Sequence, residues 1–381
     1  MKRSSERILV THQGTLPRDL ELRELVLARD FGKPHDAAKL NARLKSVVHE
    51  MVGKQRSLGI DLVNDGEQSK SGFQYYARTR ISGHQARDTS SEQKARFPYD
   101  RDRRDFPGFF KQSPVTRKWS FVTDALKYIG HEQLRTDIAN LKAAIAANGE
   151  GAAEGVMMAV APGTIEHWMQ NEYYKSQEEF VFALAECMAV EYKAITDAGL
   201  ILHIDNPDLA DGWQMFPDMS VSQYQAYADV RIEALNRALE GIDPTRVIFH
   251  VCWGSFHNPH TNDLPLADLI DLFFKVRAQA ISIEASCPRH EHEWTVFEKV
   301  KLPADRILIP GVVGHVTDMI EHPELVAQRL VRYAKLVGRE NVIAGTDCGI
   351  GSRVGHAEIC WAKLNTLAEG ARLASKTLWG R

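Results

Sequence analysis

The most constraining feature of this 381-residue sequence is an eightfold alternation between short β-branched or apolar runs and longer segments of helical period. The runs expected to form strands are Ile8–Gly14, Ile60–Glu67, Val156–Pro162, Leu200–Asp205, Val247–Trp253, Ala280–Ala285, Ile307–Val313 and Val342–Thr346. The clearest helical segments are Ala38–Leu58, Gln177–Ala198, Leu266–Val276, Pro323–Val337 and Ala357–Lys376. Eight strand–helix units predict an α/β fold, a single (β/α)8 TIM barrel formed by residues 1–381.

The extra length for such a barrel lies between the second and third expected strands. Residues 83–119 are polar, contain Pro98, Pro107 and Pro114, and predict an enlarged loop excursion over the barrel mouth. Basic residues outnumber acidic ones in this segment. The segment could therefore bind an anionic substrate tail, or it could be a solvated loop tied by its own Arg–Asp pairs.

Charge and hydropathy exclude several classes of partner. The formal net charge is −3, so the chain has no general basic field that would attract nucleic acid or a membrane surface. No apolar run approaches the roughly 20 residues that span a bilayer, and the first residues do not resemble a secretory signal. We therefore expect a cytoplasmic protein. Its five cysteines are an odd, scattered set that argues against a disulfide framework.

Potential metal ligands gather at the ends of three expected strands. His250 and Cys252 are two residues apart on one strand and so share a face, while Glu284 and Cys348 end two further strands. In a barrel these ends meet at one rim. One imidazole, two thiolates and one carboxylate suit Zn²⁺ in tetrahedral geometry.

The other three cysteines are read differently. Cys187 and Cys360 lie on apolar helix faces and are expected to be core residues, since a free cysteine packs as a small hydrophobe. Cys287 follows Glu284 closely enough to reach the rim, so its role is left open.

At these positions the sequence resembles the cobalamin-independent methionine synthase superfamily, specifically its short single-barrel members, which include epoxyalkane:coenzyme M transferase. The matching stretches are Thr11–Arg18, Asn64–Glu67, His203–Ala210, His250–Gly254, Pro288–Trp294, Glu321–Arg329 and Gly345–Gly349. The resemblance implies the barrel type shared by uroporphyrinogen decarboxylase and methionine synthase. It also implies Zn²⁺ on His250, Cys252, Glu284 and Cys348. For Thr15, Glu67 and Asp205 it implies contact with substrate.

The sequence departs from the family pattern at two places. After the fourth strand it reads Asp205-Asn206, which keeps the aspartate and loses a carboxylate associated with folate and amino-acid binding. After the seventh strand an aspartate and a basic residue of the short relatives are missing, and His315 stands between their positions. Tetrahydrofolate as methyl carrier or product is thus an open expectation.

The function implied by the resemblance is zinc-dependent alkyl transfer, most simply methyl transfer, to a substrate thiolate. Zinc lowers the pKa of a thiol and holds its sulfur as a nucleophile. The leaving atom then needs a general acid, for which the candidates are Asp205, Glu67, His12, His257 and His315.

Several alternatives stay open at this point. They are epoxide opening by a thiol of the coenzyme M type, a zinc-dependent barrel hydrolase, a closed structural zinc site and a metal-free decarboxylase. The expected partners are a small-molecule thiol and an alkyl donor. A homo-oligomer is compatible with the sequence.

Overall fold

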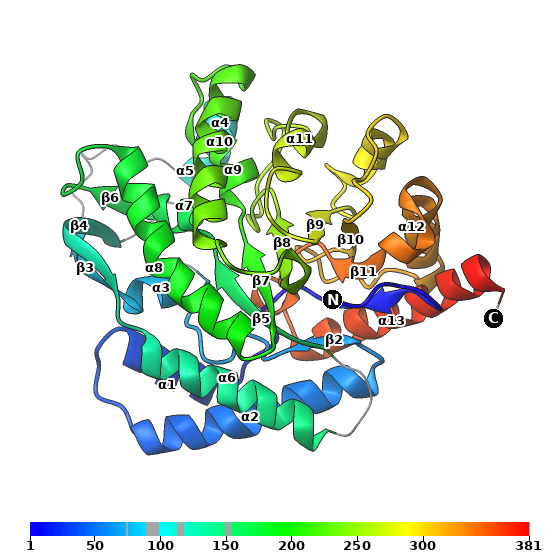
Figure 1. Cartoon of the computed structure of the whole chain (residues 1–381), viewed down its shortest axis with the longest axis horizontal. Coiled ribbons are helices and arrows are strands. Elements are labelled where there is room, and N and C mark those ends of the chain that lie inside the picture. Colours follow the sequence, from blue (N-terminus) through cyan, green and yellow to red (C-terminus); the bar gives the residue numbers. More distant parts are fainter. Residues whose placement is uncertain (74, 89–98, 113–117, 149–153, 381) are drawn as a thin grey trace.

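The computed structural model describes residues 1–73, 75–88, 99–112, 118–148 and 154–380, and these form a barrel of eight parallel strands surrounded by helices (Figure 1). Around the barrel the strands are β1 (Leu9–Val10), β11 (Ile343–Thr346), β10 (Ile307–Val313), β9 (Ala280–Glu284), β8 (Val247–Val251), β7 (Ile201–Asp205), β5 (Glu154–Val160) and β2 (Leu62–Asn64). All eight expected strands are therefore confirmed, and the fold is a TIM barrel.

Helices flank these strands within the described ranges. They are α1 (Leu20–Asp30), α2 (Ala37–Ser57), α3 (Tyr75–Thr79), α4 (Asp100–Asp105), α5 (Pro107–Lys111), α6 (His131–Ala147), α7 (Pro162–Glu166), α8 (Gln177–Asp197), α9 (Asp208–Met215), α10 (Val221–Ala238), α11 (Ile270–Phe273), α12 (Pro323–Val337) and α13 (Ala357–Trp379). The expected helices at α2, α8, α12 and α13 are confirmed to within a few residues. The one expected over 266–276 is shorter, a 3-10 turn followed by α11.

The barrel interior changes from apolar to polar along the strands. Its amino-terminal half is filled by buried apolar side chains, namely Leu62, Val156, Met158, Ile201, Ile248, Ala280, Ile307, Ile309 and Ile343. Because side chains two apart share a strand face, the next inward positions on β7, β8 and β9 are His203, His250 and Ser282. Polar chemistry is thus confined to the carboxyl ends of the strands, where this fold places its active sites.

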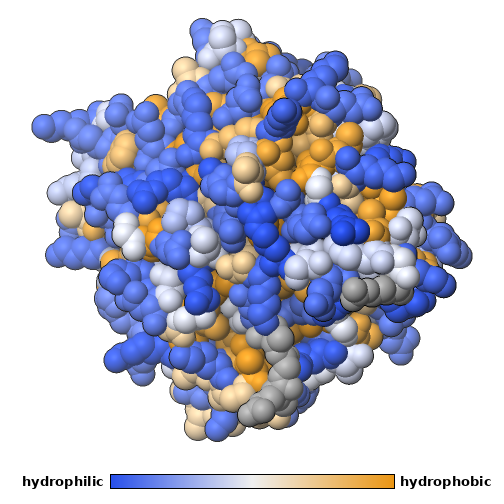
Figure 2. Space-filling model, turned by 45° about the vertical axis from the view of Figure 1, so that its right-hand side comes forward, coloured by the Kyte–Doolittle hydropathy of each residue, from blue (hydrophilic) through white to orange (hydrophobic). Residues whose placement is uncertain are grey.

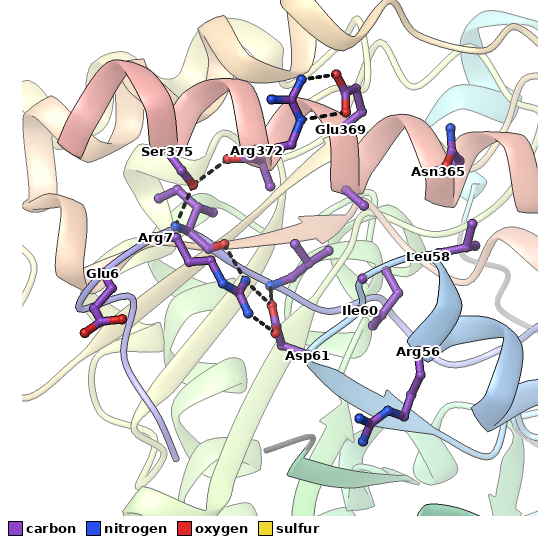
Figure 3. A pocket seen from close by; sticks show the side chains of 15 residues that line it. Glu6, Arg7, Arg56, Leu58, Ile60, Asp61, Asn365, Glu369, Arg372 and Ser375 are labelled. Atoms are coloured by element: carbon purple, nitrogen blue, oxygen red, sulfur yellow. Dashed lines mark hydrogen bonds and ion pairs between the residues drawn. The ribbon is translucent and has the colours of Figure 1, made fainter. Parts of the chain in front are cut away.

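The barrel closes where β1 meets β2. The Asp61 N–H donates to the Val10 carbonyl oxygen at 2.9 Å, and the Asp61 carboxylate accepts the Val10 N–H at 2.9 Å. Arg7 forms two hydrogen bonds to the same carboxylate (Figure 3). A groove of about 800 Å³ lies beside this seam, between α13 and the residues that precede β1 and β2. One carboxylate therefore ties both edges of the sheet together.

The excursion after β2 contains regular structure that the sequence did not predict. β3 (Ile81–Asp88) pairs with β4 (Lys118–Tyr128), which also pairs with β6 (Met169–Asn171), and this second sheet lies to one side of the barrel (left in Figure 1). Residues 89–98 and 113–117 of the expected excursion lie outside the described residues.

The short helices α4 and α5 cross toward the barrel mouth. The Arg101 guanidinium donates to three backbone carbonyls after β7, those of Trp213, Phe216 and Met219. The Asp102 carboxylate accepts three hydrogen bonds from the loop after β8. The donors are the Thr261 hydroxyl, the Asn262 backbone N–H and the Asn262 side-chain amide. These bonds place this part of the excursion against two loops of the rim.

Hydrophilic side chains cover much of the face drawn in Figure 2, with apolar ones visible between them. Among the described residues, no helix combines the length and the apolar character that crossing a membrane requires.

The seam yields a stability prediction. In Asp61→Ala the Val10 N–H loses its acceptor, and we expect the free energy of unfolding to fall by about 1–3 kcal/mol in urea titrations. Arg7→Met is the matched control, because it removes an exposed ion pair and leaves the bond to Val10 in place. Its expected cost is about 0–1 kcal/mol. Equal losses in the two variants would contradict this assignment.

Candidate metal centre and substrate cavity

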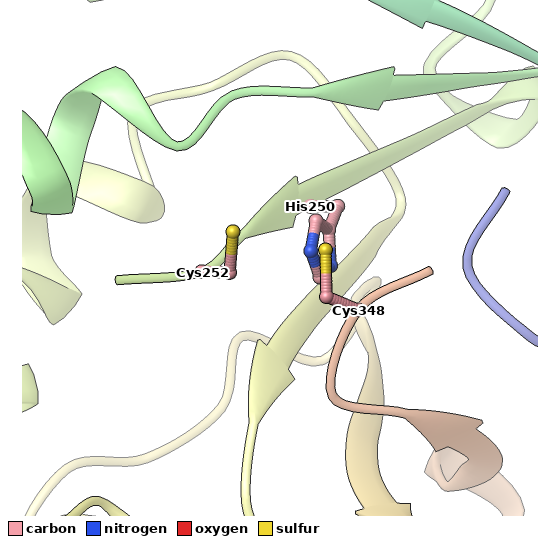
Figure 4. Close-up of side chains that lie close together, drawn as sticks. All are labelled: His250, Cys252 and Cys348. Carbon is pink, nitrogen blue, oxygen red and sulfur yellow. The ribbon is translucent and has the colours of Figure 1, made fainter. Parts of the chain in front are cut away.

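Three potential metal ligands lie together at the carboxyl end of the barrel. His250 on β8, Cys252 just beyond it and Cys348 just beyond β11 are buried, and each offers one ligand atom within 4.8 Å of the others (Figure 4). His250 and Cys252 point to the same side because they are two residues apart. The structure thus brings together three of the four residues in which the sequence analysis expected metal ligands.

The imidazole of His250 is oriented by one of its two nitrogens. Nδ1 lies 3.0 Å from the Ser282 hydroxyl oxygen on the neighbouring strand β9. Nε2 is buried and has no hydrogen-bond partner among the described residues. Since a buried polar atom without a partner is costly, and since metal-binding histidines are held through their other nitrogen, Nε2 has the surroundings of a ligand atom.

The two thiols of the cluster differ in acidity. The hydrogen bond from Cys252 lowers the pKa of the Cys348 thiol well below its ordinary value, and the His250 and His315 rings add to that shift. The same hydrogen bond, together with burial, raises the pKa of Cys252. Ser255 also donates to the Cys348 sulfur at 3.4 Å. Without metal, Cys348 is therefore the more acidic thiol of the pair.

Glu284 ends β9 beside this cluster and is not part of the group of three. Its Oε1 accepts the Trp253 N–H at 3.1 Å, and burial followed by the charge of Asp347 raises its pKa to about 8. The carboxylate is thus held next to Cys252 by the backbone of the following residue. Cys287 is half-buried and also stays outside the group.

Asp347 holds the end of β11 in place, a role that the sequence analysis did not identify. Its carboxylate accepts the N–H groups of Ala285 and Ser286 at 2.8 and 3.0 Å and the Ser286 hydroxyl at 2.6 Å. Gly311 on the intervening strand β10 permits this approach, since a Cβ there would lie 2.4 Å from the Asp347 Cα. The signal available in the sequence was an acidic residue directly before a candidate ligand.

A cavity of about 160 Å³ opens beside the two cysteines. It is lined by Gln13, Gly14, Thr15, Glu67, Phe73, Trp168, Asp205, Pro207, Asp211, Cys252, Gly254, Ser255, Phe256, Cys348, Gly349 and Arg353. The three expected substrate-binding residues, Thr15, Glu67 and Asp205, are all among them. The Thr15 hydroxyl donates to Glu67 Oε2 at 2.5 Å, and Glu67 adopts a φ of 55°, a strained conformation that tends to occur at functional sites.

Of the five candidate acids, the cavity wall contains only Asp205 and Glu67. Burial, followed by the charges of Cys348 and Glu67, raises the pKa of Asp205 well above its ordinary value. His12 hydrogen-bonds through Nε2 to Gln55 on α2, which places its ring on the helix side of the barrel wall. Asp205 is therefore a candidate acid with a raised pKa inside the cavity.

The two remaining histidines do not line the cavity either. His257 is exposed. His315 is buried, neither of its ring nitrogens has a hydrogen-bond partner among the described residues, and burial lowers its pKa to about 4. It is thus neutral at neutral pH.

Behind Trp253 two histidines share one carboxylate. Asp263 Oδ2 lies 2.8 Å from His260 Nδ1 and 3.1 Å from His290 Nε2, and the His290 ring stacks on Trp253. Burial lowers the pKa of both histidines, but the hydrogen bonds to Asp263, and for His290 also to Glu293, outweigh burial and raise each pKa to about 9. Both rings are therefore cations at neutral pH and stabilise the native fold.

Comparison with known proteins finds similarity to methionine synthases. Residues 134–372 match the family model of the cobalamin-independent synthase catalytic domain. The methionine synthases of Sulfurisphaera tokodaii and Sulfolobus acidocaldarius are each 24% identical to this chain. The alignments cover 96% of this chain in both cases, and 92% and 91% of the two relatives.

Solved structures give the same fold. The B12-independent methionine synthase of Shewanella sp. W3-18-1, in complex with selenomethionine, matches with a TM-score of 0.75 at 19% identity over 98% of this chain and 100% of that one. A protein of Listeria monocytogenes described as a vitamin-B12-independent methionine synthase matches with a TM-score of 0.66 at 16% identity, over 96% and 98% of the two chains.

The difference in thiol acidity predicts selective alkylation. Iodoacetamide at pH 7 should label Cys348 of metal-free protein before Cys252, and before the buried Cys187 and Cys360, whose pKa values burial raises to about 11. Peptide mass spectrometry over a time course measures the order. Labelling of Cys252 ahead of Cys348 would contradict the prediction.

The histidine pair predicts a pH dependence of stability. A group whose pKa is raised from 6.5 to about 9 by folding stabilises fully below pH 6.5 and loses this contribution as the pH rises through 9. The two rings share Asp263, so we expect a combined loss on the order of 3 kcal/mol between pH 6.5 and 9.5 in urea titrations. Asp263→Asn should reduce this part of the slope, although Glu293 still interacts with His290. An identical slope in that variant would refute the assignment.

Proposed function

The chain belongs to the family of cobalamin-independent synthase catalytic domains, and from this premise we propose that it transfers a methyl group to the sulfur of a small thiol such as homocysteine. The observation that carries the proposal is the buried cluster at the rim. His250 Nε2 lacks a hydrogen-bond partner among the described residues, and one nitrogen of this ring lies within 4.8 Å of the Cys252 and Cys348 sulfurs. One nitrogen and two sulfurs are a zinc-type donor set.

The residues at the rim fit Zn²⁺ with one position left for exchange. His250, Cys252 and Cys348 would hold the ion, and Glu284, positioned by the Trp253 N–H, is the proposed fourth ligand. A carboxylate is the donor that an incoming thiol most readily replaces, because thiolate is the softer ligand. When bound, Zn²⁺ supplies the acidity that converts a substrate thiol to a thiolate nucleophile at neutral pH.

The cavity beside the cysteines supplies the rest of the thiol site. Thr15 and Glu67 are already hydrogen-bonded to each other on one wall, and Asp205 lies on the wall formed by β7. Carboxylates in a cavity of low dielectric favour a cationic group such as an α-ammonium. We therefore assign Thr15, Glu67 and Asp205 to the polar end of an amino-acid thiol.

The two cysteines of the proposed metal site argue against hydrolysis. Two thiolates donate charge to a zinc ion and make bound water less acidic, whereas hydrolytic sites use histidine and carboxylate. Asn206 also differs from the folate-using pattern, since its amide donates to Asp208 Oδ1 at 2.5 Å instead of offering a carboxylate. The donor set therefore favours methylation of a thiol.

Replacement of Cys348 tests this function. Cys348→Ser should lower zinc content well below one ion per chain and abolish methylation of homocysteine, because one ligand is lost. The circular dichroism spectrum should keep its native shape. Cys287→Ser is the matched control, a neighbouring cysteine outside the group of three, and should keep both zinc and activity.

Elemental analysis and a thiol methylation assay give the two readouts. Full zinc content and full activity in Cys348→Ser would remove this residue from the ligand set and would refute the proposed function.

A further inference from the structure

The wall of the substrate cavity is acidic beyond the thiol site. Glu67, Asp205 and Asp211 line it, against one guanidinium, that of Arg353, which is exposed and lies over the Phe256 ring. The proposed thiol site uses Glu67 and Asp205. Asp211, on α9, is left without a role in it.

Asp211 is a buried carboxyl group with an unused oxygen. The residue is 7% exposed, and its Oδ1 has no hydrogen-bond partner among the described residues. The imidazole Nδ1 of His167 lies 3.9 Å away, beyond hydrogen-bonding range. Burial followed by the charges of Asp208 and Asp263 raises its pKa well above the ordinary value, although the His260 cation opposes this. Such a group gains most from a ligand that brings a positive charge.

Aromatic rings share this part of the cavity. Phe73, Trp168 and Phe256 line the same space as Asp211. Gly254, with a φ of 92°, brings two of these groups close, because a Cβ there would lie 3.1 Å from the Phe256 ring and 3.6 Å from the Asp211 Cβ. Aromatic faces next to a carboxylate form the surroundings that recognise quaternary ammonium groups.

The size of the cavity limits the ligand. Its volume of about 160 Å³ is close to the roughly 150 Å³ that holds a benzene molecule in a protein interior. The enclosed part of the cavity therefore takes a compact group.

We propose that the methyl donor of this protein is a small onium compound, a quaternary ammonium or a sulfonium, whose cation binds between Asp211 and the Phe256 ring. The proposal rests on the proposed function and names the substrate class of the same site. In the reaction the thiolate sulfur forms a bond to the methyl carbon, and the bond from that carbon to nitrogen or sulfur breaks. The electron pair stays on the leaving atom, which departs as a neutral amine or thioether.

This chemistry also removes the need for a general acid. A methylated folate leaves as an amine anion unless it is protonated, whereas an onium leaving group is neutral without a proton. Of the candidate acids, only Asp205 and Glu67 line the cavity, and the proposed thiol site already uses both carboxyl groups. An onium donor therefore needs no proton from these two groups, which stay available to the thiol substrate.

Binding of two isosteric probes tests the proposal on the zinc-loaded protein. Choline and its uncharged isostere 3,3-dimethylbutan-1-ol differ in charge and hardly in shape. Titration calorimetry should give at least a tenfold tighter dissociation constant for choline. Asp211→Asn should bring the two probes to within about threefold, and Phe256→Leu should weaken choline alone by about tenfold. Asp197→Asn, an exposed aspartate on α8, is the control and should behave as the parent.

Turnover distinguishes the possible donors. Three methyl donors are compared with homocysteine as acceptor. Glycine betaine is the quaternary ammonium donor (the first onium arm), S-methylmethionine is the sulfonium donor (the second onium arm), and 5-methyltetrahydrofolate is the neutral donor (the folate arm). We expect methionine from one of the onium arms, with a rate that falls at least tenfold in Asp211→Asn. The folate arm should give none.

Equal affinity for choline and its isostere, or unchanged choline binding in Asp211→Asn, would overturn the proposal. Turnover from the folate alone would overturn it too and would leave thiol methylation intact. If cobalt-substituted protein shows the same absorption spectrum with and without homocysteine, thiol activation itself fails, and the donor proposal falls with it.

Discussion

The site depends on a bridge that the Asp347 carboxylate makes between the ends of two strands that are not neighbours. It accepts two backbone N–H groups and one hydroxyl from Ala285 and Ser286, reaching over the glycine at position 311 of the strand between them. Three hydrogen bonds to one buried carboxylate restrain the position of residue 347. Cys348 is the next residue, so the bridge determines where its sulfur lies relative to His250.

Much of this arrangement could be read from the sequence because it follows from periodicity. Eight apolar runs separated by helical segments specify the barrel, and a parallel barrel brings all carboxyl strand ends to one rim. The two-residue spacing of His250 and Cys252 then fixes their common face. Cys348 joins them because its strand also ends at that rim, although its exact approach required the glycine on the strand between.

The parts that sequence reasoning missed depend on pairing between distant segments. The antiparallel strands β3 and β4 stand at the two ends of the polar excursion, and their pairing with each other and with β6 joins segments that the local sequence pattern does not connect. For Glu284 the sequence predicted the position on the strand but not the contact of its side chain. Its position at a strand end was correct, yet its carboxylate bonds to the Trp253 N–H, a contact that no spacing rule encodes. His257 similarly lies at the rim in sequence and is exposed in the fold.

X-ray absorption spectroscopy of the zinc-loaded protein tests the central claim most directly, because it counts the sulfur neighbours of the ion. The account predicts two sulfur atoms at about 2.3 Å, together with nitrogen and oxygen neighbours, and a third sulfur once homocysteine is added. A first shell with no sulfur, or one that homocysteine leaves unchanged, would contradict it.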